Sequence, residues 1–192
     1  MVMVDGANGE QEPTAKSLIP GAGIASWAVV RDRLRTPEQY RTYWLSTVRP
    51  DGRPHAMPVL GLWHDEAFYF ISGETARKAS NLPLNPACVL TVGITSLPAL
   101  DLTIEGEAAK VTDETTLRRV VAAYGSELRW PLELREGVVF GPSAPTSGPP
   151  PYAVFELVPK TVYGLPGVTG TDEQGQSTTE PVAPTRWRFR DR

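Results

Sequence analysis

The alternation of apolar and polar positions divides residues 43–71 into three strand-like runs separated by short turns. Strands are predicted at 43–48, 53–63 and 67–71. Arg49-Pro50-Asp51-Gly52 joins the first two runs and His64-Asp65-Glu66 joins the last two, and both segments have the residue types of short hairpin connections. The pattern therefore predicts an antiparallel meander.

More strands are predicted further along the chain. Residues 87–94 are apolar on both faces, as is the run 67–71, so we expect both to be covered on each side. Residues 100–105 alternate between apolar and polar side chains, as in a strand with one face in water. The last strands are expected near residues 152–158, 161–163 and 185–189.

Two helices are predicted from capping and spacing. Thr36-Pro37-Glu38-Gln39 has the features of a helix start, with Thr36 as the cap and Gln39 closing a capping box. Apolar residues recur at helical spacing from Leu117 to Tyr124, after Thr112 and Asp113, which can cap. Residues 141–151, GPSAPTSGPPP, predict a stiff, polyproline-like arm. We hypothesise that this arm forms a pocket wall near Tyr152.

A third helix, expected to start near Gly73, carries Arg77 and Lys78 in its first turns. Cations are unfavourable at that end of a helix dipole unless an anion also binds there. Exposed amides, two hydroxyl groups and two positive side chains together predict a phosphate site. The candidate residues are Ser72, Thr75, Arg77, Lys78 and Asn81.

Length, charge and cysteine usage narrow the possible classes. The 192 residues suit one domain, and we expect a mobile tail over residues 1–20 and a cofactor-binding domain over 21–192. A net charge of -3 argues against a nucleic-acid partner. Cys88 is the only cysteine, and neither an export signal nor a membrane span is recognisable, so we expect a cytoplasmic location. No spacing of ligands suggests a metal site.

The second predicted strand contains Pro54 and Pro58, which give no ladder hydrogen bonds. The strand is therefore either an edge strand or one whose backbone meets something other than a neighbouring strand. From the prolines alone, an edge strand or bulge without a ligand is the simpler interpretation. The phosphate site predicted one hairpin later favours a bound cofactor.

Several segments together resemble a known family. They are WLSTVRPDGRPHAMPV, SGETARKASNL followed by NP, GPSAPTSGPPPYAVFELVPKTVYG and the terminal PTRWRF. This pattern, over most of residues 25–190, resembles the pyridoxamine 5'-phosphate oxidase-like split barrels, in particular their flavin and deazaflavin oxidoreductases. The resemblance implies a mainly β fold, a six-stranded antiparallel split β-barrel of the FMN-binding type with peripheral helices. It also implies a homodimer with the cofactor at the interface.

The resemblance also implies site residues. In related proteins the cofactor ring lies along the strand that matches His55, Ala56, Met57, Pro58 and Val59. His55 is a candidate donor to a ring oxygen or, alternatively, a partly buried structural histidine. A terminal segment that approaches the cofactor in relatives matches Trp187 and Arg188, although ordinary core packing competes for Trp187. No catalytic side chain can be assigned.

The function implied is that of an oxidoreductase using the deazaflavin F420, which passes a hydride to an electron-poor double bond of a small organic substrate. FMN is the alternative cofactor. An arginine group can meet a polyglutamate tail that FMN lacks, and it comprises Arg31, Arg33, Arg35 and Arg41. Two other classes stay open. One is a protein that binds a flavin or F420 without turnover, and the other is a haem binder using His55 or His64.

Overall fold

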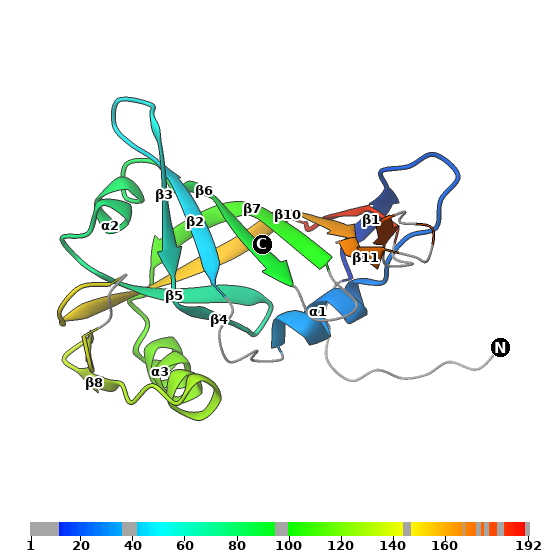
Figure 1. Ribbon diagram of the computed structural model, residues 1–192. Coiled ribbons are helices and arrows are strands. Elements are labelled where there is room, and N and C mark those ends of the chain that lie inside the picture. The colour runs from blue at the N-terminus through cyan, green and yellow to red at the C-terminus, as the bar shows by residue number, and fades with distance from the viewer. Residues whose placement is uncertain are drawn as a thin grey trace.

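The computed structural model describes residues 12–35, 42–94, 100–143, 147–166, 168–171, 174, 177–179 and 183–190. Strands dominate this part of the chain (Figure 1). The strands are β1 (Thr14–Ser17), β2 (Tyr43–Val48), β3 (Pro54–Val59), β4 (Gly61–His64), β5 (Ala67–Gly73), β6 (Ala87–Ile94), β7 (Leu100–Lys110), β8 (Glu133–Arg135), β9 (Val138–Phe140), β10 (Tyr152–Pro166), β11 (Val168–Thr171), β12 (Ser177–Thr179) and β13 (Thr185–Arg188). The helices are α1 (Trp27–Arg35), α2 (Arg77–Asn81) and α3 (Glu114–Leu128).

The long strand β10 organises the main sheet. One edge of β10 pairs with β7 along residues 155–166, and its other edge pairs first with β5 and then with β13. The sheet continues from β7 through β6 and β2 to β3, while β4 extends it beyond β5. Because β3 and β4 end the two branches without pairing with each other, the curled sheet does not close. The prediction of a mainly β split barrel is confirmed.

The single strand predicted over residues 53–63 is two strands in the structure. Residues up to Val59 pair with β2, and residues from Gly61 pair with β5, so the break between the two strands falls at Leu60. The hydroxyl of Tyr124, on α3, donates to the Leu60 carbonyl at 3.1 Å, which satisfies a group that the break removes from a ladder. A side chain at Gly61 would lie 2.4 Å from the Tyr69 carbonyl oxygen, so this crossing requires glycine.

Apolar side chains fill the barrel and seal one end. Phe68, Phe70 and Phe155 stack inside it, and Trp27 of α1 packs against Trp63 and Trp187, with ring centroids 5.9 and 5.7 Å apart. A second cluster lies on the other face of β4 and β5, where α3 covers it. The helix predicted after Asp113 is confirmed, and the Asp113 carboxylate accepts from the Thr116 amide.

Three sequence expectations need comment. The expected tail over residues 1–20 is wrong for residues 14–17, because β1 pairs with β13 and gains a full strand ladder. The helix predicted from Thr36 lies outside the described residues. The β8–β9 hairpin was not predicted, because each strand has only three residues, although Glu136-Gly137 forms a two-residue turn with positive φ at both positions.

No helix in the described ranges has the length and apolar character to cross a bilayer.

Candidate functional site

The candidate site lies at an open edge of the barrel, where β3 pairs with β2 on one side only. In this ladder His55 lies opposite Thr47 and Met57 lies opposite Leu45. Ala56 and Met57 are exposed, and Met57 retains 42% of its accessible surface. The strand with two prolines is thus an edge strand. Its second backbone edge pairs with no strand among the described residues, so a flat ligand can approach it.

Helix α2 lies beside the β2–β3 hairpin (Figure 1). The Asn81 side-chain amide donates to Thr47 Oγ1 at 2.9 Å, and both residues are buried. This bond attaches the helix to β2. Arg77 is exposed, whereas Lys78 is only 3% exposed. The helix starts at Arg77 rather than near Gly73, and its five residues give little macrodipole, so positive charge here comes mainly from side chains.

The charges of three cations, Arg49, Arg77 and Lys78, act on His55, and we call these residues the basic cluster. Burial first, and then the charges of these three residues, hold the pKa of His55 below its usual value. Burial also lowers the pKa of Lys78. The lowered pKa of His55 favours its neutral imidazole. The like charges come together because α2 contacts β2 and the β2–β3 turn directly follows β2.

Two buried polar atoms at this place have no hydrogen-bond partner within the described part of the chain. They are Nε of Arg49 and Nδ1 of His55. Buried polar groups in proteins are normally paired, so unpaired atoms beside concentrated positive charge fit the requirements of an anion. Asp51, the acid nearest in sequence to Arg49, is engaged by Arg53, whose guanidinium donates to it at 2.9 and 2.7 Å. The residues present therefore fit a phosphate group.

Arg49 was not among the residues predicted from the sequence. It precedes the Pro50-Asp51-Gly52 turn, where a basic residue is ordinarily a solvated surface charge. In the structure its backbone closes the hairpin, donating to the Arg53 carbonyl at 2.9 Å and accepting from the Gly52 amide at 2.8 Å. The signal in the sequence was the shortness of the turn, which pairs Arg49 with Arg53, two residues before His55.

The other predicted residues are placed as follows. Ser72 is fully buried and its hydroxyl donates to the Gly73 carbonyl, so its side chain is engaged within the chain. Thr75 is exposed near α2, and Pro58 lies on β3 beside Trp44. Val59 belongs to the barrel core.

The structure places Trp187 in the core of the subunit, while an approach to the cofactor across a dimer interface stays a prediction. The side chain has no exposed surface, packs against Trp27, and donates through Nε1 to the Ala25 carbonyl at 3.3 Å. Arg188 is exposed but lies on β13, which pairs with β1 and β10, away from α2 (Figure 1). The structure therefore does not bring these two residues to the basic cluster within one subunit.

The proline-rich arm ends against the strand that leads into α2. Ser147 accepts from the Gly73 amide at 3.0 Å through its carbonyl, and its hydroxyl donates to the Ile71 carbonyl at 3.2 Å. The Tyr152 hydroxyl donates to the Gly148 carbonyl at 2.8 Å. These bonds attach the arm next to the candidate site. Its role as a pocket wall stays a hypothesis.

Replacing Gly73 with alanine is expected to destabilise the protein by about 1–3 kcal/mol, in the range of overpacking. A Cβ atom there would lie 2.7 Å from the Ser147 carbonyl oxygen, so the arm has to move. Thermal unfolding measures the effect. Gly125→Ala on α3 is the matched control, because nothing lies within 4 Å of its Cβ position and alanine favours a helix. A Gly73→Ala protein as stable as the wild type would show that the arm is not packed there.

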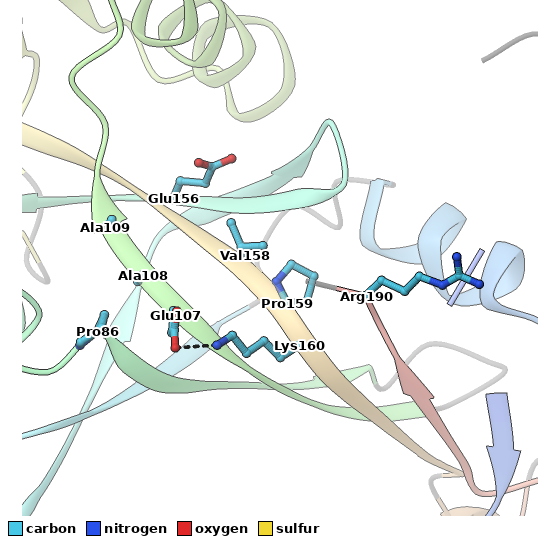
Figure 2. Close-up of a pocket in the computed structure, with 9 residues that line it drawn as sticks. All are labelled: Pro86, Glu107, Ala108, Ala109, Glu156, Val158, Pro159, Lys160 and Arg190. Atoms are coloured by element: carbon cyan, nitrogen blue, oxygen red, sulfur yellow. Dashed lines mark hydrogen bonds and ion pairs between the residues drawn. The ribbon is translucent and has the colours of Figure 1, made fainter. Parts of the chain in front are cut away.

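A separate groove of about 470 Å³ lies on the outer face of β7 and β10 (Figure 2). Lys160 and Glu107 form an ion pair across it at 2.6 Å, and Glu156 accepts from the Tyr69 hydroxyl at 2.8 Å. A second cavity of about 550 Å³ continues over β2 and β6 and shares the same ion pair. The carboxylates of the groove are already paired, in contrast to the unpartnered atoms at Arg49 and His55.

Comparison with known families decides where the chain belongs. The family model described as pyridoxamine 5'-phosphate oxidase matches residues 30–165. This chain belongs to the pyridoxamine 5'-phosphate oxidase family. The resemblance inferred from the sequence is thereby confirmed, and the match contains both the β3 edge and the basic cluster. No curated protein matches the chain.

Solved structures of this family type support the fold. A conserved hypothetical protein from Mycobacterium tuberculosis is 18% identical with a TM-score of 0.54, covering 79% of this chain and 95% of that one. A candidate pyridoxamine 5'-phosphate oxidase from Listeria innocua is 23% identical with a TM-score of 0.50, covering 71% and 98%. A heme binding protein from Mycobacterium smegmatis is 15% identical with a TM-score of 0.50, covering 82% and 59%. At these identities the likeness concerns the fold alone.

Proposed function

We propose that this member of the pyridoxamine 5'-phosphate oxidase family binds a phosphorylated flavin-type cofactor and works as an oxidoreductase. F420 is our leading cofactor and FMN is the alternative. One observation carries the proposal: the basic cluster acts on His55 of the edge strand β3, and buried atoms of Arg49 and His55 are unpartnered among the described residues. The positive charge suits a phosphate, and the unpaired edge of β3 suits a flat ring attached to that phosphate.

The residues divide the work of binding. Arg77 can donate in a fork to phosphate oxygens, and Lys78 acts as a point charge in a dry environment. The backbone edge of β3, from His55 to Val59, is proposed to hydrogen-bond the ring. When bound, the cofactor supplies the hydride chemistry, and the protein supplies orientation and exclusion of water. The proposed substrate is a small organic molecule with an electron-poor double bond.

The charge argument for F420 over FMN changes with the fold. Arg31 lies 3.9 Å from Glu12 and Arg35 lies 2.7 Å from Glu66, so both arginines already have acidic partners. Helix α1 contacts β4, whereas α2 contacts β2 and β5, and the two helices lie apart in Figure 1. Arg41 lies outside the described residues. A polyglutamate tail that starts at α2 is therefore not expected to meet α1 of the same subunit, and the preference for F420 rests on the family resemblance.

A homodimer is part of the proposal. Trp44 lies on β2, next to the edge strand of the sheet, with 49% of its surface exposed; its ladder partners are Pro58 on β3 and Thr91 on β6. A large exposed aromatic side chain on a sheet face is costly in water and suits an interface. A second subunit on this face would also bring its own side chains towards the open edge of β3.

The haem alternative gains no support from the histidines. Both ring nitrogens of His64 lie 3.7 Å from carboxylates, those of Asp65 and Glu127. His55 lies among three cations.

Side-by-side titrations with F420, FMN and riboflavin test the proposal. We expect FMN to bind at least about ten-fold more tightly than riboflavin, because riboflavin lacks the phosphate and each charged hydrogen bond contributes about 1.5–3 kcal/mol. Fluorescence of the cofactor measures binding. Equal affinity for FMN and riboflavin would show that the phosphate makes no contact, and binding of neither F420 nor FMN would refute the proposed function. Oxidation of reduced F420 by a panel of enones, quinones and tetrapyrroles then separates an enzyme from a carrier.

A further inference from the structure

His55 is the neutral member of a positively charged site. Its backbone is held in place, since the Thr47 hydroxyl donates to its carbonyl at 3.4 Å and β3 pairs with β2. Its Nδ1 atom is buried and unpartnered among the described residues. The positive charges of Arg49, at the β2–β3 turn, and of Arg77 and Lys78, on α2, act on it. The neutral polar groups nearby, Thr47 and Asn81, bond to each other.

We propose that His55 binds the anionic group of the ligand and takes up a proton when it does so, giving the site a further positive charge only while it is occupied. This inference rests on the proposed function and deepens it. It assigns the His55 side chain to the phosphate rather than to a ring oxygen, where the sequence suggested it. The ligand class is a dianionic or polyanionic group, as in a phosphate ester.

The physical reason is the change in electrostatic surroundings on binding. In the free protein, burial and three like charges hold the pKa of His55 below its usual value, which favours the neutral ring. A bound dianion offsets these charges and favours the imidazolium, in which both ring nitrogens donate. By linkage, whatever raises the pKa of His55 must itself bind more tightly as the pH falls. Anion affinity should therefore rise by up to about ten-fold per pH unit between the two pKa values.

Sulfate is the appropriate first probe, because it remains a dianion from pH 5 to 8 whereas phosphate itself titrates. The chain has only two histidines, so His64→Gln leaves His55 as the single imidazole signal in an NMR pH titration. We expect the pKa of His55 to be higher in saturating sulfate than in chloride of equal ionic strength. Sulfate should also bind several-fold more tightly at pH 5.5 than at pH 7.5. His55→Gln, which keeps a hydrogen-bonding side chain without the charge, should lose that pH dependence.

Arg49→Ala adds an independent observation. Removing one cation is expected to raise the pKa of His55 in the free protein and to weaken sulfate binding. The inference is overturned if sulfate leaves the pKa of His55 unchanged, if sulfate does not bind, or if His55→Gln retains the full pH dependence. The proposed function survives each of these results if FMN or F420 still binds with dependence on phosphate. If neither cofactor binds but sulfate raises the pKa of His55, the anion site stands and the cofactor proposal falls.

Discussion

Replacing Arg77 with alanine together with Lys78→Met should weaken the binding of F420 or FMN by about 3–6 kcal/mol, the sum of two charged contacts. Lys78 is almost fully buried, so its ammonium group interacts with an anion with little screening by water. Methionine retains the buried volume of Lys78 without its charge, which separates binding from folding. Fluorescence titration measures the dissociation constants of the double variant and of the two single variants.

Lys110→Ala is the matched control for this experiment. Lys110 is a half-exposed cation outside the basic cluster. It pairs with Glu74, which lies close to α2 in the sequence. Its loss should leave cofactor affinity unchanged. If Arg77→Ala with Lys78→Met binds as tightly as the wild type, the phosphate does not lie at α2 and the proposed site is wrong. If Lys110→Ala weakens binding equally, the effect reflects overall charge.

Trp187→Ala should lower the free energy of unfolding by about 3–5 kcal/mol, the usual cost of removing a fully buried aromatic side chain. The ring has no exposed surface, and Gly164 leaves space for it, since a Cβ atom there would lie 2.8 Å from the indole. Its loss would open the cluster with Trp27 and Trp63 that seals one end of the barrel. Chemical denaturation measures the change.

Trp187→Phe and Trp44→Ala provide the comparison. We expect Trp187→Phe to lose less stability and to bind cofactor like the wild type, because the ring is a core element. Trp44→Ala removes an exposed side chain and should barely change the stability of the folded subunit. A Trp187→Phe protein that keeps its stability but loses cofactor affinity would show that Trp187 contacts the cofactor, from its own or the partner subunit.

The sequence by itself determined much of the local structure. The predicted strand at 43–48 and the predicted strand at 87–94 coincide with β2 and β6, because apolar runs between strong turn signals leave few alternatives. The sequence also indicated Arg77 and Lys78 as candidate phosphate ligands, since two cations at a predicted helix start require a reason, and this assignment stays a prediction. These features depend on neighbours a few residues away, which a single sequence displays directly.

Only the tertiary structure decided which residues meet. Arg49 joins the basic cluster because the hairpin places the end of β2 near α2, and Asn81 is a structural anchor because Thr47 lies opposite it. The break at Leu60 depends on the two different partners of β3 and β4, and the burial of Trp187 depends on Trp27, 160 positions earlier. Such contacts join distant parts of the chain, and hydrophobic periodicity shows that a side chain is buried without showing against what.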